Sequence, residues 1–158
     1  MRIAVLADTH IPKRAKTLPE KAWEIVRSAD AIIHAGDVLS RVFLEELKEA
    51  APLYVVRGNN DVDLDDLAEV LEFSIEGVNI ALIHDSGPKD GRARRMRKRF
   101  PHADLVIFGH SHIPMDETVE DLHLFNPGSA TDRRLQPRCS LGLLELNAGR
   151  MTSEIVFL

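Results

Sequence analysis

The sequence predicts an α/β domain whose strands form either two sheets or one large mixed sheet. In the first half of the chain, short and nearly continuous apolar runs alternate with segments of helical periodicity, which is typical of parallel strands covered on both faces. In the second half, apolar runs follow one another across short turns, which favours antiparallel pairing. No repeat, low-complexity tract or linker divides the 158 residues, so we expect one domain over 1–158.

Three strands and two helices are expected in the first half. The apolar runs 2–7, 31–35 and 53–56 predict strands. The segments 18–28 and 41–50 between them predict helices, because their apolar residues recur at helical spacing. Strands joined through helices in this order favour parallel pairing.

A hairpin, a helix and three further strands are expected in the second half. An acidic loop with four aspartates over 61–66 leads to the hairpin, whose strands 73–75 and 78–83 flank the turn Glu76-Gly77. The remaining elements are a basic helix and three strands, at 89–100, 105–108, 141–146 and 152–158.

The composition excludes several classes of protein. The chain is 44% hydrophobic and carries 20 Lys and Arg against 25 Asp and Glu, a net charge of −5, which argues against a protein that coats nucleic acid. The lone Cys139 excludes a disulfide framework and fits a reducing compartment. The first apolar run, 3–7, is too short for a signal peptide or a membrane span. We therefore expect a cytoplasmic protein that does not contact membranes.

Polar side chains with ligand chemistry follow five of the expected strands. Because the carboxyl ends of strands share one edge of an open α/β sheet, these side chains are expected to converge. Any one of them alone is more often a turn residue, but carboxylate, amide and imidazole donors at all five places favour divalent metal binding. The seven residues are Asp8, His10, Asp37, Asn59, His84, His110 and His112.

The spacing of these residues has a mechanical interpretation. In Asp8-Thr9-His10, side chains at i and i+2 of an extended segment project the same way and can hold one cation, and His110-Ser111-His112 repeats that spacing. Glycines precede Asp37, Asn59 and His110, so the backbone can turn sharply there and approach the site closely.

The ordered blocks resemble those of the calcineurin-like metallophosphoesterase superfamily, and the compact size resembles its small prokaryotic phosphodiesterase branch. The blocks are Asp8-Thr9-His10, Gly36-Asp37, Gly58-Asn59-Asn60-Asp61, His84 and Gly109-His110-Ser111-His112, followed by the turn Asn126-Pro127-Gly128-Ser129. The resemblance implies two mixed β-sheets packed as a sandwich, with helices on the outer faces. It also implies a metal-dependent phosphodiesterase.

The resemblance divides the ligands between two divalent cations. Asp8, His10, Asp37 and His112 would hold the first ion, and Asp37, Asn59, His84 and His110 the second. Asp37 would bridge ions about 3.5–4 Å apart, which share a hydroxide as nucleophile. Oxygen and nitrogen ligands without thiolate suit manganese, nickel, cobalt, iron or zinc.

Three positions depart from the family pattern. Asn60 stands where most members carry a histidine that protonates the leaving group or binds the phosphate, so Asn60 is expected at the substrate but without acid function. Good leaving groups, such as aryl esters, are therefore favoured. Asp85 stands where many relatives have glycine and is expected to point away or to orient an imidazole. Ser40 replaces a common second acid, and its effect stays open.

Other polar features are weighed for substrate and partner binding. Arg134 and Arg138 are candidates to bind the phosphate of a phosphodiester, with nucleotides among the substrates considered. The basic segment 89–99 favours a solvated helix face over a nucleic-acid surface, since no aromatic residue interleaves with its charges. His34 is expected to be a hydrogen-bonded core residue. Two alternatives to the phosphodiesterase stay open. One is a nuclease, and the other is a non-catalytic interaction scaffold, because a retromer subunit resembles this family. Since relatives often form dimers or larger assemblies, a homo-oligomer is also considered.

Overall fold

The first sheet is built around strand β1, Arg2–Leu6, at the start of the chain. In the computed structural model, which describes residues 1–158, β1 pairs in parallel with β2, Ala31–His34, which in turn pairs in parallel with β3, Leu53–Val55. On its other side β1 pairs antiparallel with β9, Ser140–Asn147, and β9 pairs with β10, Arg150–Phe157. The order β10-β9-β1-β2-β3 therefore joins the two ends of the chain in one sheet.

The second sheet is also five-stranded and mixed. Its order is β4-β5-β6-β8-β7, formed by Val70–Ile75, Val78–Ile83, Leu105–Ile107, Leu122–Asn126 and Met115–Val119. The pairs β5·β6 and β6·β8 are parallel, whereas the hairpins β4·β5 and β7·β8 are antiparallel. Of the two arrangements that the sequence allows, the protein thus forms two sheets and not one large one.

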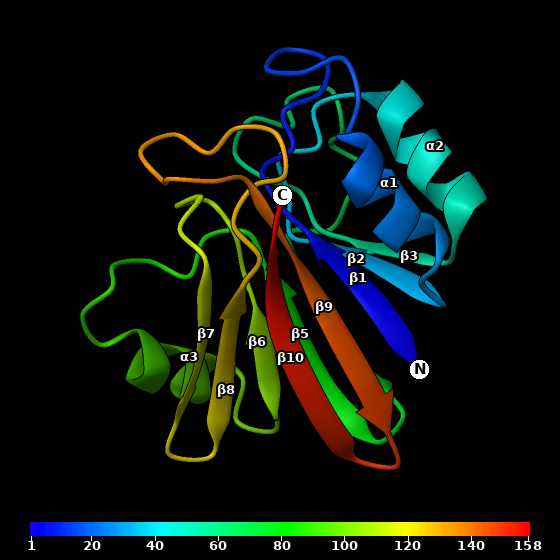
Figure 1. The fold of residues 1–158 in the computed structure, drawn as a ribbon. Coiled ribbons are helices and arrows are strands. Elements are labelled where there is room, and N and C mark those ends of the chain that lie inside the picture. Colours follow the sequence, from blue (N-terminus) through cyan, green and yellow to red (C-terminus); the bar gives the residue numbers. More distant parts are fainter.

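The two sheets pack face to face, with helices on their outer sides (Figure 1). Along β1, Ile3 and Val5 point into the apolar cluster between the sheets, whereas Ala4 and Leu6 point outward to helices α1, Glu20–Arg27, and α2, Arg41–Ala50. Helix α3, Arg92–Arg99, covers the outer face of the second sheet through Met96. Burial on both faces explains why β1 and β2 are apolar at nearly every position.

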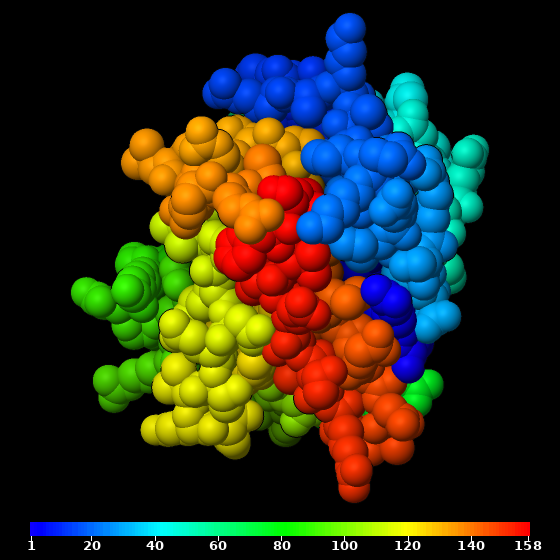
Figure 2. Space-filling view, viewed as in Figure 1, coloured from blue at the N-terminus to red at the C-terminus, as the bar shows by residue number.

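The outermost strands of the sheets approach each other along one side of the molecule. In the space-filling view, β10 (red) lies beside the β7–β8 hairpin (yellow) (Figure 2). The hydroxyl of Ser153 on β10 donates to Asp116 on β7 at 2.8 Å, and Asp116 also lies 2.8 Å from the ring of His123. None of the three helices is long and apolar enough to span a membrane.

The predicted elements are found with three differences. Strand β4 begins at Val70, three residues before the expected start, and α3 begins only after Gly91, whose φ of +72° interrupts the helical backbone. The β7–β8 hairpin was not expected: β7 is an exposed edge strand of sequence MDETV without the apolar run that marks buried strands, and the largely buried β8, LHLFN, was missed although its apolar residues were visible. Ser40, whose role was open, caps α2 by accepting a hydrogen bond from the Phe43 amide at 3.3 Å.

One close contact between the sheets depends on a glycine. Gly142 of β9 lies opposite Val5, and a Cβ added to it would stand 2.3 Å from the ring of Phe125, which is fully buried on β8. We expect Gly142→Ala to lower the free energy of unfolding by about 1–3 kcal/mol, because the ring must shift in a close-packed layer. Urea denaturation measures this.

The double variant Gly142→Ala/Phe125→Leu tests the cause. Leucine removes the ring edge that the new methyl group meets, so the double variant is expected to lose less stability than the two single losses combined. Strictly additive losses would show that the alanine acts elsewhere.

Candidate metal centre

The seven expected ligands meet at one edge of the sandwich. They lie in the loops that follow β1, β2, β3, β5 and β6, and those after β1, β2 and β3 gather at the top of Figure 1. The sequence argument for convergence, based on the shared carboxyl ends of strands, is thus matched by the geometry.

Two groups of potential ligand atoms share Asp8. In one group, atoms of Asp8, His10 and His112 all lie within 4.8 Å of one another, with Nε2 of His112 3.6 Å from Oδ1 of Asp8. In the other, Nε2 of His84 lies 3.6 Å from Oδ2 of Asp37 and 3.9 Å from Oδ1 of Asp8. These separations leave room for a cation between the donors in each group.

Asn59 and His110 extend the second group toward solvent. The amide oxygen of Asn59 lies 2.9 Å from Nε2 of His84 and 3.1 Å from Nδ1 of His110. Both residues are exposed, whereas the other five ligands are buried. The centre therefore has a buried end around Asp8 and an open end that a substrate can reach.

Unpartnered buried atoms show that the site fits a metal ion. Neither carboxylate oxygen of Asp8 has a hydrogen-bond partner, nor does Nε2 of His112, although all three atoms are buried. Burial raises the pKa of Asp8 well above its ordinary value, and the charge of Asp37 adds to this, while Arg134 acts in the opposite direction. A buried carboxylate without a partner is costly, and a divalent cation would compensate that cost.

The imidazoles are oriented for ligation by backbone carbonyls. Nδ1 of His84 donates to the Ala35 carbonyl at 2.7 Å, and Nδ1 of His112 donates to the Asp132 carbonyl at 2.5 Å. Each ring therefore turns the lone pair of Nε2 into the site. Burial is also the main cause that lowers the pKa of both histidines, which favours the neutral form that binds metals.

Asp37 lies between the two groups. Its Oδ2 is 3.1 Å from Nε2 of His10, a member of the first group, and 3.6 Å from Nε2 of His84 in the second. Burial alone would raise the pKa of Asp37, but hydrogen bonds from His10 and Asn60 and the charge of His84 hold it below its usual value. Asp37 and Asp8 are thus the two carboxylates within reach of both groups of donors.

Five of the seven ligands have left-handed backbone conformations. The φ angles are +53° at Asp8, +47° at His10, +59° at Asp37, +69° at His110 and +61° at His112. The extended geometry proposed for the spacing of Asp8 and His10 is therefore wrong: the side chains meet through tight turns, not along an extended segment. Such conformations are disfavoured in L residues and cluster at functional sites.

Asp61 is a residue of the centre to which the sequence assigned no role. Its carboxylate accepts hydrogen bonds from the amides of Asp37 at 2.9 Å, Gly58 at 2.7 Å and Leu39 at 2.8 Å. It thereby joins the loop after β2 to the loop after β3. Its position within Gly58-Asn59-Asn60-Asp61 was visible, but an acidic residue in an acidic loop carries no local sign of burial.

His34 fulfils the core role expected of it. Its Nδ1 accepts from the Gly36 amide at 3.2 Å, so the neutral ring carries its proton on Nε2 and donates it to Thr9 at 3.0 Å. Burial, followed by the charge of His84, lowers the pKa of His34 to about 3. The ring thus connects the loops after β1 and β2 without taking up a proton near neutral pH.

The positions that depart from the family pattern lie around the open end. Asn60 donates from its backbone amide to Oδ1 of Asp37 at 2.8 Å and from its side chain to Oδ2 at 2.7 Å. Asp85 accepts from the Gly87 amide at 2.8 Å and has its other oxygen 3.9 Å from Nε2 of His110. That separation is too long for a hydrogen bond, so the orientation of an imidazole by Asp85 stays a prediction.

The two arginine candidates are separated. Arg134 lines a cavity together with His10 and Asn60 and therefore lies at the centre. Arg138 instead lies 5.7 Å above the ring of Phe157 and donates to the Leu158 carbonyl at 3.4 Å. The structure brings Arg134, but not Arg138, to the expected ligands.

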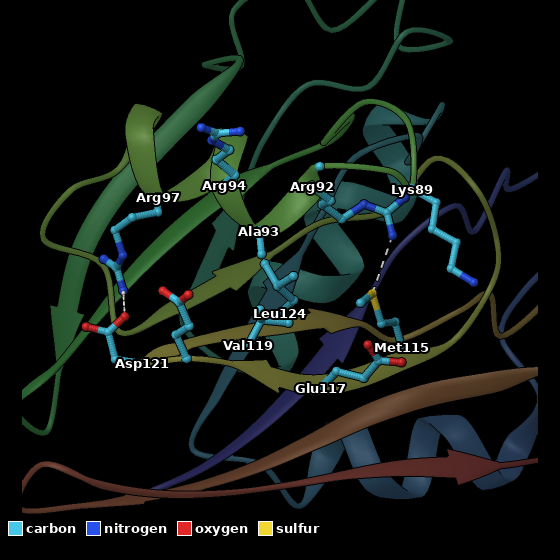
Figure 3. Close-up of a pocket in the computed structure, with 12 residues that line it drawn as sticks. Lys89, Arg92, Ala93, Arg94, Arg97, Met115, Glu117, Val119, Asp121 and Leu124 are labelled. Atoms are coloured by element: carbon cyan, nitrogen blue, oxygen red, sulfur yellow. Dashed lines mark hydrogen bonds and ion pairs between the residues drawn. The ribbon is translucent and has the colours of Figure 1, made fainter.

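The basic helix lines a groove of about 600 Å³ on another part of the molecule, between α3 and the β7–β8 hairpin (Figure 3). Arg97 pairs with Asp121 at 3.2 Å across the groove, and Arg92 donates to the sulfur of Met115 at 3.4 Å. Arg95, on the same helix, is bound to the Ser86 carbonyl at 2.7 Å. These contacts favour the structural interpretation of the basic segment over a nucleic-acid surface.

Comparison with known proteins identifies the family. The model of the calcineurin-like phosphoesterase superfamily domain matches residues 1–149, so the chain belongs to that superfamily and is a hydrolase. It is 36% identical to a probable metallophosphoesterase of Methanothermobacter thermautotrophicus over 159 residues, which cover 99% of this chain and 92% of the relative. It is 28% identical to a phosphodiesterase of Methanocaldococcus jannaschii over 144 residues, covering 81% and 83%.

Solved structures show the same fold. Vacuolar protein sorting 29 from Cryptosporidium parvum superimposes with a TM-score of 0.82 at 21% identity, covering 99% of this chain and 97% of that one. The expected sandwich of two mixed sheets with outer helices is confirmed.

The hydrogen bonds of Asp61 generate a prediction about metal affinity. We expect Asp61→Ala to weaken manganese binding about 10–100-fold, because the three amides that fix the Asp37 and Asn59 loops lose their acceptor. Calorimetric titration with Mn²⁺ measures the dissociation constant. The matched control is Asp65→Ala, which removes an exposed carboxylate from the same loop. Equal affinities of the two variants would contradict the positioning role.

Proposed function

We propose that this protein is a phosphodiesterase that requires two divalent metal ions. The observation that carries the proposal is the set of buried, unpartnered donors of Asp8 and His112, beside a carboxylate, Asp37, that reaches both groups of ligands. In the proposal, Asp8, His10, Asp37 and His112 hold one ion, and Asp37, Asn59, His84 and His110 hold the other. Manganese, nickel, cobalt, iron and zinc all suit these donors.

When bound, the ions supply a water of lowered pKa as nucleophile and neutralise the charge that develops on the phosphate. The chain itself positions the metal-binding side chains and sets their protonation states. Hydrogen bonds to carbonyls orient His84 and His112, and the low pKa of Asp37 keeps its carboxylate ionised throughout the neutral range. The exposed side of Asn59 and His110 leaves space for the substrate.

Asn60 and Arg134 are proposed to face the substrate phosphate. Asn60 is exposed next to Asp37, and Arg134 lines the adjoining cavity. A carboxamide has no proton to give to an alkoxide, so the leaving oxygen must depart largely unassisted. The proposed substrates are therefore phosphodiesters with good leaving groups. The proposed location is the cytoplasm, because the free thiol of Cys139 suits a reducing compartment.

A non-catalytic scaffold is not favoured. Scaffold function needs no set of buried donors without partners, whereas Asp8 and His112 have such atoms. The relatives at 36% and 28% identity bear the names of a probable metallophosphoesterase and a phosphodiesterase.

The direct test is hydrolysis of bis-p-nitrophenyl phosphate with added Mn²⁺. We expect Asp37→Asn to lower kcat by about a hundredfold or more, because the neutral amide cannot hold two cations. Asp65→Asn, an exposed substitution, is the control and should retain the wild-type rate. No hydrolysis by the wild type, or equal rates for wild type and Asp37→Asn, would favour the scaffold.

The leaving-group preference is tested by restoring the histidine. Asn60→His is expected to raise activity on alkyl phosphodiesters relative to aryl ones by tenfold or more, out of the roughly 10²–10⁴-fold that a general acid contributes. The measurement is the ratio of kcat/KM for matched methyl and p-nitrophenyl esters. An unchanged ratio would show that the absence of an acid at this position does not set the preference.

A further inference from the structure

Two cavities are lined by different candidate ligands of the metal centre. One, of about 470 Å³, is lined by His10 and Asn60 together with Lys13, Arg14, Asp63 and Arg134, and we name it the cationic cavity. The other, of about 420 Å³, is lined by Asn59 and His84 together with Arg57, Arg99, Glu69 and Asp85, and we name it the balanced cavity. A phosphodiester bound at the centre has two arms, and each cavity is placed to receive one.

The two cavities differ in charge. The cationic cavity holds three basic side chains and one carboxylate, a net charge of +2. The balanced cavity holds two basic side chains and two carboxylates, so its net charge is zero. A phosphate group on one arm of the substrate is therefore attracted to the cationic cavity and finds no equivalent field on the other side.

The basic groups of the cationic cavity are also available for binding. Neither Lys13 nor Arg134 is among the ion pairs of the chain, and Arg14 pairs only through Nε, at 3.5 Å from Asp132. The same oxygen of Asp132 lies 3.7 Å from Nδ1 of His10, so the charge of Asp132 is not directed at Arg14 alone. In the balanced cavity, Nε of Arg57 is bound to the Asp61 carbonyl at 3.1 Å, so the difference between the two cavities lies in their net charge.

The walls of the cationic cavity are held in place from the metal centre. The amide of Arg14 donates to the His10 carbonyl at 2.8 Å, which fixes the turn that carries Lys13. The hydroxyls of Thr131 and Ser129 donate to the carbonyls of Thr9 and Asp8, respectively, and so join the segment before Arg134 to the same loop. The backbone segments that carry the basic groups thus have a fixed relation to the proposed reaction site.

We propose that the substrate is a phosphodiester that carries a second phosphate on one arm, and that Lys13 and Arg14 bind this second phosphate, beside Arg134, which faces the scissile one. The other, uncharged arm lies in the balanced cavity. This inference rests on the proposed phosphodiesterase function and specifies its substrate class. Arginine and lysine bind phosphate through charge-assisted hydrogen bonds, which are stronger than neutral ones.

The test compares how tightly four thymidine ligands bind to the manganese-loaded protein. These are the dinucleotide without terminal phosphate, its 5′-phosphorylated and 3′-phosphorylated forms, and the trinucleotide. We expect one of the terminally phosphorylated dinucleotides to inhibit the hydrolysis of bis-p-nitrophenyl phosphate with an inhibition constant about tenfold lower than that of the unphosphorylated one. A gain seen with the trinucleotide alone supports the same site with an internal phosphate of an oligonucleotide as its source. Equal inhibition constants for all four overturn the inference and leave the phosphodiesterase function standing.

The inference stays testable if no hydrolysis occurs. In that case the proposed function has failed, and the dissociation constants of the same four ligands, measured by calorimetry on the manganese-loaded protein, decide whether the cationic cavity binds a second phosphate. Equal dissociation constants overturn the inference, and tighter binding of a ligand with a second phosphate supports it.

Two variants locate the effect. Lys13→Gln removes a charge that has no partner in the chain and is expected to reduce the preference for the second phosphate at least threefold. Arg94→Gln removes an equally exposed charge from the distant groove beside α3 and is the matched control, with an unchanged preference (Figure 3). Equal preferences in the two variants would show that the cationic cavity does not bind the second phosphate.

Discussion

The arrangement of the centre follows from the burial of two carboxylates, Asp8 and Asp37, close together at one edge of the sandwich. Two like charges removed from water repel each other, and both carboxylate oxygens of Asp8 lack a well-formed hydrogen bond, so the backbone amide of His110 compensates its charge only in part. Divalent cations resolve this conflict, and the neutral imidazoles around the carboxylates can ligate cations without adding charge. The carboxylates, the imidazoles and the tight turns that carry them thus form one electrostatic unit.

The scaffold maintains this unfavourable arrangement through hydrogen bonds between loops. The five left-handed ligand residues would relax if their loops moved independently. Asp61 joins the loops after β2 and β3, His34 joins those after β1 and β2, and Thr131 holds the segment before Arg134 against the loop after β1. The sandwich core below the loops is apolar on both faces of β1 and β2, which gives the loops rigid starting points.

Charge is distributed unevenly around the centre. The residues proposed to select the substrate are therefore different from those proposed to hold the metal ions. The candidate ligands lie in the sequence blocks that resemble the superfamily, whereas the charges of the cavity beside His10 and of the cavity beside His84 come largely from residues outside those blocks. Relatives that share the ligands but differ at positions such as Lys13 and Arg134 are expected to select other substrates. Most of the basic charge of α3 lies away from the centre, where Arg97 pairs with Asp121, whereas Arg99 lines the balanced cavity.

The sequence by itself determined the alternation of strands and helices and the seven candidate ligands, because apolar periodicity and a polar residue after a strand are local properties of the chain. It did not reveal β7, since an exposed edge strand needs no apolar run, and the buried strand β8, LHLFN, was missed although its apolar residues were visible. Only the tertiary structure decided that Asp61 is buried against three amides, that Asn60 donates to Asp37, and that Arg134 rather than Arg138 lies at the site. These features arise from contacts between segments far apart in the chain, whose geometry no local pattern encodes.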